Sequence, residues 1–193
     1  MLYVAGEVWA YDNLQPHVRI PPRIRPSLKP TIEIEPTAPA EAPKEVEGLG
    51  GIVENSEIGI DWNGGAKDQG TPLEAYISRQ NPDATQLPAT SKTFDEFNKI
   101  TGEAISAKTM NTLSVSYIKN PQRIYWRMKG YVDATVDYKP RTDFDVDPTE
   151  IESRTIHLAI PEYTSSTQWR YLFMSILYGR ERGVSLVITR IRE

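Results

Sequence analysis

The sequence predicts an α/β fold in which a small mixed sheet lies between helices, preceded by an extended arm. Two observations support this prediction. From residue 71 onward, amphipathic helical patterns alternate with short apolar runs in the order helix, strand, strand, helix, strand, helix, strand. A chain of 193 residues with 39% hydrophobic and 25% charged residues is also long enough for one globular domain with an attached arm.

The arm and linker are expected to occupy residues 1–66. Eight prolines lie between Pro16 and Pro43, a density that suits an extended segment and disfavours helices and central strands. The residues that follow, up to residue 66, are rich in glycine and acidic side chains. The folded domain is therefore predicted to span residues 67–193.

The first helix of that domain is predicted to begin at Thr71. Pro72 suits the first helical position, and Glu74 completes a capping box of the form Ser/Thr-x-x-Glu. Asn81 and Pro82 end the helix. In this interpretation Glu74 reaches back to the helix N-terminus and serves the fold alone.

The remaining elements follow from apolar spacing. A hairpin is expected around a turn near residues 99–102, and strands at 155–161 and 184–191. A second helix opens at Asn120-Pro121 and a third ends between Gly179 and Gly183. The predicted core faces of these two helices are Ile124, Met128, Tyr131 and Val132, and Trp169, Leu172, Phe173, Ile176 and Leu177.

Composition excludes several kinds of site. The chain has no cysteine, so it contains no disulfide and no thiolate zinc site. With only His17 and His157, a metal site must use mostly oxygen ligands. No apolar run approaches the ~20 residues that span a bilayer. The net charge is −4, but residues 1–66 carry −5 and the rest +1, so the predicted domain can still present a basic face.

The predicted hairpin carries polar groups where a sheet normally buries apolar ones. Strand alternation puts Ser106 and Lys108 on one face, and Asp95 on the preceding strand can lie beside them. A helix packed on that face could add Glu74. Carboxylates that hold a divalent cation, together with a lysine that orients water or neutralises charge at phosphorus, are what phosphodiester hydrolysis requires.

Four separated segments carry a resemblance to a known family. They are GTPLEAYISRQNP, TFDEFNKITGEAISAKTMNT, IKNPQRIYWRMKGYVD and IHLAIPEYTSSTQWRYLFMSILYGRERGVSLVIT. These segments resemble the nuclease toxin domains at the C-termini of contact-dependent growth-inhibition (CdiA-type) proteins. Those domains belong to the PD-(D/E)xK, restriction-endonuclease-like superfamily. The likeness covers roughly residues 68 to 193.

The resemblance implies a role for four residues. Glu74 matches the first-helix acid of the family and Asp95 its central strand acid, so both are implied metal ligands. Lys108 matches the catalytic lysine. Ser106 stands where most of the superfamily has a second strand acid, which leaves one fewer carboxylate and opens the question of one or two metal ions.

The resemblance also implies a function. It predicts a metal-dependent endonuclease toxin of bacterial competition, with DNA as the preferred substrate and tRNA as the alternative. One divalent ion, Mg²⁺, Mn²⁺ or Zn²⁺, would be the cofactor, with hard oxygen ligands favouring the first two. The toxin would be secreted or displayed at the cell surface as part of a larger protein, act in the target-cell cytoplasm, and be neutralised by a cognate immunity protein.

Simpler interpretations stand beside these. Asp95, Ser106 and Lys108 could be ordinary strand residues, and the domain a non-catalytic interaction module. Arg123, Arg127 and Lys129 of the second helix could contact nucleic-acid phosphates, although a charged helix face is usually only solvated. The aromatic residues of the helices are more often core residues than stacking platforms.

Overall fold

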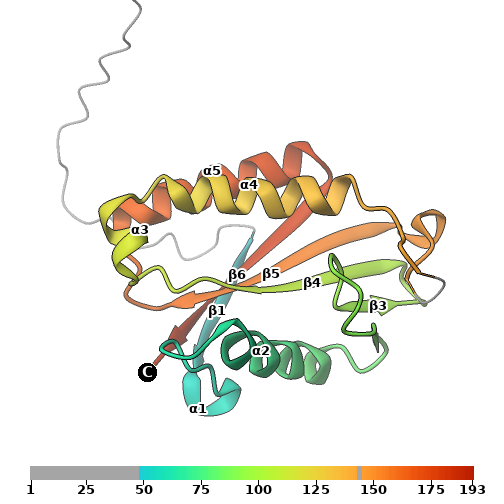
Figure 1. Cartoon of the computed structure of the whole chain (residues 1–193), viewed down its shortest axis with the longest axis horizontal. Helices are drawn as coiled ribbons and strands as arrows, with labels where there is room; N and C mark the ends of the chain where they lie inside the picture. Colours follow the sequence, from blue (N-terminus) through green and yellow to red (C-terminus); the bar gives the residue numbers. More distant parts are fainter. Residues whose placement is uncertain (1–47, 143–144) are drawn as a thin grey trace, which may run out of the picture. The chain divides into compact units, whose positions relative to one another are not determined.

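A six-stranded mixed sheet forms the centre of the computed structural model, which describes residues 48–142 and 145–193. The strands are β1 (Leu49–Glu54), β2 (Thr85–Gln86), β3 (Glu96–Asn98), β4 (Glu103–Thr109), β5 (Ser153–Pro161) and β6 (Val184–Arg192). Their order is β1-β6-β5-β4-β3-β2 (Figure 1). Strands β1, β6, β5 and β4 run parallel to one another, β3 runs antiparallel to β4, and β2 runs antiparallel to β3. The predicted mixed sheet is confirmed, whereas the predicted proline-rich arm lies outside the described residues.

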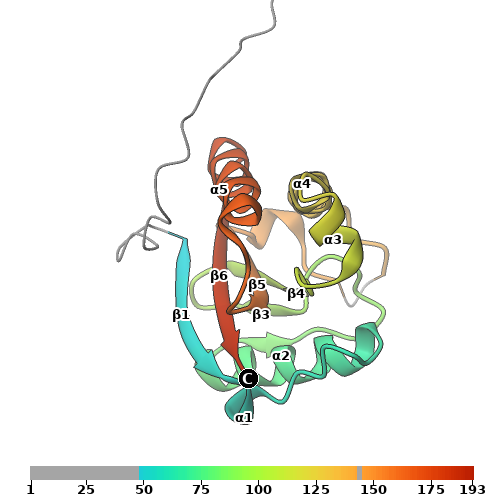
Figure 2. The same cartoon turned by 90° about the vertical axis from the view of Figure 1, so that its left-hand side faces the viewer.

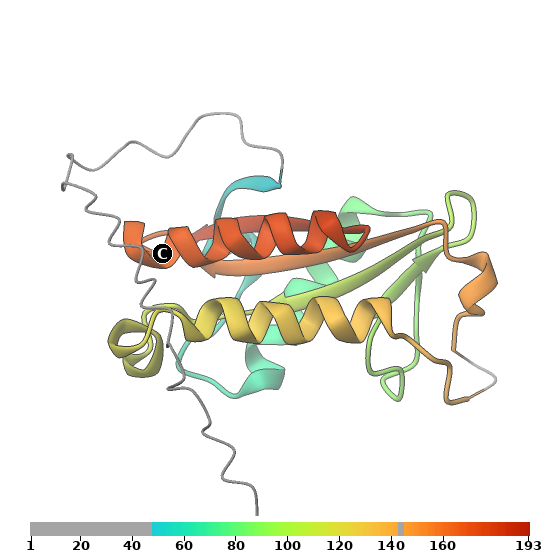
Figure 3. The same ribbon diagram turned by 90° about the horizontal axis from the view of Figure 1, so that it is seen from above.

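Helices cover both faces of the sheet. They are α1 (Asn55–Ile58), α2 (Ala66–Gln80), α3 (Val115–Lys119), α4 (Arg123–Val136) and α5 (Ser166–Glu181), with a short 3₁₀ turn at Pro148–Glu150. Figure 2 shows α2 on one side of the sheet and α4 and α5 on the other. In the view from above, α4 and α5 lie side by side (Figure 3).

Strand alternation divides the core into two layers. Ile156, Leu158 and Ile160 of β5 pack with α4 and α5, whereas Ile105 and Ala107 of β4 pack with α2. Each fully buried aliphatic side chain contributes about 1.5–3 kcal/mol of transfer free energy. The sequences of the central strands are nearly continuous apolar runs because helices cover both faces of these strands.

The predicted apolar stripe of α4 is confirmed at Ile124, Met128 and Val132, each 0% exposed. In α5, Leu172 and Ile176 are buried as predicted, but Leu177 is 57% exposed and does not belong to the core face. The hairpin turn near residues 99–102 is confirmed by the antiparallel pairing of β3 with β4.

The start of α2 differs from the prediction. The helix begins at Ala66, where the Gly65 N–H donates to the Asp68 carboxylate at 2.8 Å, so Pro72 lies inside it. Proline cannot donate to the carbonyl four residues earlier. That carbonyl belongs to Asp68, and it accepts instead from the N–H of Asp61 at 3.5 Å. Glu74 therefore lies beyond the first turn and is not part of a capping box.

The predicted linker contributes to the folded domain. Strand β1 pairs with β6, and Ile58 and Ile60 are buried beside Leu73 and Ile77 of α2. The domain therefore begins before residue 67, at least as early as β1. The sequence prediction failed here because β1 is a glycine-containing edge strand whose partner lies at the other end of the chain.

Within residues 48–142 and 145–193, no helix combines the length and the apolar character that crossing a bilayer requires.

Candidate nuclease site

The backbone of Ala107 is the point around which the candidate site is built. Its N–H donates to Asp95 Oδ2 at 2.7 Å, and its carbonyl accepts from Lys108 Nζ at 2.8 Å. Lys108 Nζ also donates to Asp95 Oδ2 at 3.1 Å, and both side chains are 22% exposed. Asp95 and Lys108 are thus fixed to the same peptide segment and remain open to solvent.

This arrangement depends on the short length of β3. Strand β3 pairs with only the first three residues of β4, Glu103–Ile105. The later residues of β4 therefore have an edge without a strand partner. Asp95 immediately precedes β3, and its carboxylate occupies that edge.

Glu74 approaches from helix α2, on the Ile105 and Ala107 face of the sheet. It lines a cleft of about 500 Å³ together with Asp95 and residues of the loop that precedes β3. Burial raises the pKa of the Glu74 carboxyl, as does the charge of Asp95, and the charge of Lys108 opposes this. Two carboxylates and an ammonium group therefore interact at one open position.

Ser106 does not join this group. It is 2% exposed, and its Oγ donates to the carbonyl of Thr93 at 2.6 Å. By register Ser106 and Lys108 share a face with Ile156 and Leu158, away from α2, as alternation predicts. The lysine side chain is long enough to reach around the strand edge, whereas the serine hydroxyl is not.

Glu96 is a residue that the sequence interpretation missed. It is 2% exposed, and its Oε1 accepts a hydrogen bond from Ser78 of α2. Burial raises the pKa of its carboxyl; the Ser78 hydrogen bond opposes this, and the charges of Asp95 and Glu74 add to it. Because Glu74 lies one helical turn before Ser78, the Ser78–Glu96 contact helps to fix Glu74 relative to Asp95. In the sequence, the only feature that points to Glu96 is its position next to Asp95.

The three basic residues predicted to contact nucleic acid separate into two groups. Arg123 and Arg127 line a pocket on the outer surface of α4. Lys129 instead forms an ion pair with Asp133 of the same helix, and its ammonium lies over the Tyr178 ring of α5. Lys129 is therefore engaged in helix packing, away from the two arginines.

Residues 69–189 match the family described as the CDI toxin restriction endonuclease-like domain. The chain belongs to this family. The match includes Glu74, Asp95, Ser106 and Lys108 and leaves β1 outside it. The resemblance to contact-dependent growth-inhibition toxins is thereby confirmed.

Two relatives of this CDI toxin family carry functional names. Deoxyribonuclease CdiA of Yersinia pseudotuberculosis is 31% identical over 142 residues, covering 72% of this chain and 13% of that protein. Deoxyribonuclease CdiA-o11 of Escherichia coli O157:H7 is 33% identical over 142 residues, covering 72% of this chain and 38% of that protein. The chain therefore spans well under half the length of either relative.

A solved structure also matches the CDI toxin domain. It is the CdiA-CT/CdiI toxin and immunity complex from Yersinia pseudotuberculosis, with 30% sequence identity and a TM-score of 0.57. The match covers 62% of this chain and 98% of that chain. The predicted restriction-endonuclease-like fold is confirmed.

Proposed function

We propose that the domain is a metal-dependent endonuclease toxin that hydrolyses phosphodiester bonds in DNA. The observation that carries this proposal is the placement of Asp95 and Lys108 on the open edge of β4, beside a cleft shared with Glu74. The names of the two relatives support DNA as the substrate.

The carboxylates fit a divalent cation. Asp95 uses Oδ2 for Ala107 and Lys108, which leaves Oδ1 for a metal ion. Among the described residues no hydrogen bond engages the Glu74 carboxylate, and no group of three or more acidic, histidine or cysteine side chains is placed to hold a metal. One ion held by two carboxylates, water and substrate phosphate is therefore the arrangement we propose, as is usual for Mg²⁺.

Each residue then has a defined task. Glu74 and Asp95 would hold the ion, which would be Mg²⁺, Mn²⁺ or Zn²⁺. When bound, such an ion supplies Lewis-acid stabilisation of phosphoryl oxygens and a more acidic water. Lys108, fixed by Asp95 and the Ala107 carbonyl, would position the attacking water and offset the negative charge that develops at phosphorus. Ser106 would hold the segment that leads into Asp95.

The biological setting follows from the named relatives. We propose that the domain is the toxic part of a larger secreted or surface-displayed protein and acts in the cytoplasm of a target cell. A cognate immunity protein would neutralise it in the producer, and the solved toxin and immunity complex of a relative supports this partner.

Cleavage assays test the activity directly. Purified protein is incubated with plasmid DNA and with total tRNA, in EDTA and then with added Mg²⁺, Mn²⁺ or Zn²⁺. We expect plasmid cleavage that EDTA abolishes and one of the ions restores. Cleavage of tRNA alone would replace DNA as the substrate. If neither nucleic acid is cut with any ion, the enzymatic proposal is wrong.

Replacing Ser106 with alanine separates a supporting role from a direct one. The variant loses the hydrogen bond to Thr93, so we expect the free energy of unfolding to fall by about 1 kcal/mol. Metal affinity should stay unchanged, because Ser106 does not reach the cleft. Urea denaturation and calorimetric titration with Mn²⁺ measure the two quantities, with exposed Ser185→Ala as the matched control. Weaker metal binding at unchanged stability would place Ser106 among the ligands instead.

A further inference from the structure

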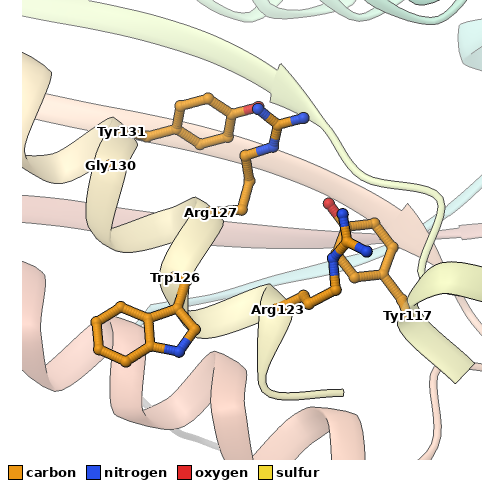
Figure 4. Close-up of a pocket in the computed structure, with 6 residues that line it drawn as sticks. All are labelled: Tyr117, Arg123, Trp126, Arg127, Gly130 and Tyr131. Carbon is orange, nitrogen blue, oxygen red and sulfur yellow. The ribbon is translucent and has the colours of Figure 1, made fainter. Parts of the chain in front are cut away.

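A second cavity lies on the outer surface of α4, separate from the Glu74 cleft. It has a volume of about 580 Å³, within the range of small-molecule sites. Figure 4 shows its lining, with Arg123, Arg127 and Tyr131 on one side of the helix and Trp126 on the other. The lining residues are Tyr117, Arg123, Trp126, Arg127, Gly130 and Tyr131. We call this cavity the α4 pocket.

The lining of the α4 pocket combines cations with aromatic rings. The guanidinium of Arg127 interacts with the Tyr117 hydroxyl and lies over the Tyr131 ring, 5.8 Å from its centre. Two tyrosines thus restrict Arg127 without neutralising it. Trp126 is 63% exposed, unusual for so large an apolar side chain, so the folded domain leaves most of its surface available for a ligand.

Gly130 keeps the pocket open. It lies one turn after Trp126 in the middle of α4, where a helical side chain would lean back towards Trp126 and Arg127. A Cβ at Gly130 would meet no atom within 4 Å, so packing does not require glycine there. Glycine in a helix interior costs about 1 kcal/mol relative to alanine. The fold tolerates this cost at the floor of the pocket.

The basic residues in and near the pocket favour an anionic ligand. Between Glu103 and Asp133 the sequence contains no aspartate or glutamate, but it contains Lys108, Lys119, Arg123 and Arg127, as well as Lys129, which is paired with Asp133. This acid-free stretch runs from the strand that carries Lys108, through α3, to the pocket itself. No acidic side chain of this segment would therefore repel a polyanion that contacts both Lys108 and the pocket.

We propose that the α4 pocket binds an unpaired nucleotide of the DNA strand, away from the phosphate that is cleaved. Arg123 and Arg127 would contact its phosphate, and the base would stack on Trp126. Nonspecific single-strand binding proteins combine the same two features, a cationic groove and exposed aromatic rings. This inference rests on the proposed nuclease function and adds that single-stranded or frayed DNA is the preferred substrate.

DNA binding can be measured apart from cleavage in a Lys108→Ala background. Fluorescence anisotropy gives the Kd for a labelled single-stranded oligonucleotide and for a blunt duplex. We expect Trp126→Ala to weaken single-strand binding roughly tenfold and duplex binding much less, and Trp126→Phe to retain most of the affinity. Arg127→Ala should reduce the salt dependence of log K by about 0.7 on the single strand.

Control variants separate binding from folding. Tyr163 is 76% exposed and Arg170 is exposed on α5, both outside the pocket, so their alanine variants should bind as the parent does. Gly130→Leu fills the pocket while favouring the helix. We expect it to have an equal or higher melting temperature and weaker single-strand binding.

Three results would overturn the inference. In the first, the parent binds DNA, but Trp126→Ala binds the single strand as tightly as the control Tyr163→Ala. The pocket then does not bind the strand, while the nuclease proposal stays intact. In the second, the pocket variants lose binding to the cognate immunity protein and keep their DNA affinity, which assigns the surface to that protein. In the third, the parent neither binds nor cleaves DNA, which removes the proposed DNA-cleaving function as well.

Discussion

Replacing Lys108 with alanine is expected to reduce DNA cleavage by about 100-fold or more, since the variant loses a positioned cation at the developing phosphoryl charge. Its ion pair with Asp95 is partly exposed, so the free energy of unfolding should change by less than about 1 kcal/mol. Plasmid cleavage with the activating ion measures the first quantity and urea denaturation the second.

An alanine substitution of a different exposed lysine provides the matched control for Lys108→Ala. Lys99, in the hairpin turn, is exposed, and Lys99→Ala should leave both cleavage and stability unchanged. A Lys108→Ala variant that is less stable but still cleaves DNA would support the non-catalytic interpretation of this lysine. Restoration of activity by Lys108→Arg would show that charge alone is required there.

A chain that begins at residue 67 is expected not to fold stably, whereas a chain that begins at residue 48 should. The shorter chain lacks β1, α1 and two isoleucines, Ile58 and Ile60, that are 8% and 3% exposed. Loss of one such side chain costs about 2–5 kcal/mol, against a total stability of about 5–15 kcal/mol. Circular dichroism during thermal unfolding distinguishes the two chains.

Point substitutions in the chain that begins at residue 48 identify which side chains cause the expected difference in stability. Ile60→Ala should lower the free energy of unfolding by about 2–4 kcal/mol. Ile52→Ala, in β1 but 38% exposed, should lower it much less. Equal urea midpoints for the chains that begin at residues 48 and 67 would show that β1 and α1 do not stabilise the domain.

The parts of the fold that were predictable have strong local patterns. Strands β5 and β6 are apolar runs bounded by turns, and α4 shows its buried stripe at the spacing of a helix. The hairpin of β3 and β4 joins neighbouring segments, so its partners were visible within a few residues. For these elements the local pattern and the tertiary packing agree.

The failures arose where distant contacts outweighed local signals. Thr71-Pro72 has the form of a helix start, but α2 continues through Pro72, and the Asp68 carbonyl that Pro72 leaves without a helical donor faces the N–H of Asp61 at 3.5 Å. Strand β1 pairs with residues about 140 positions away, so nothing nearby marks it as part of the sheet.

The sequence supplied candidate residues for the site but not their geometry. Family resemblance pointed to Glu74, Asp95, Ser106 and Lys108, and alternation placed the last two on one face. Neither could show that β3 stops early, which places the site on a strand edge instead of a sheet face. Beyond that end, Ser106 is buried through its hydrogen bond to the Thr93 carbonyl.

The early end of β3 has a second consequence, for association between chains. An unpaired strand edge can recruit a strand from another molecule and so promote aggregation. Here the Asp95 carboxylate occupies the N–H of Ala107, and the Lys108 ammonium occupies its carbonyl. The same two side chains that we assign to metal binding and catalysis therefore also protect β4 from pairing with a second copy of the chain.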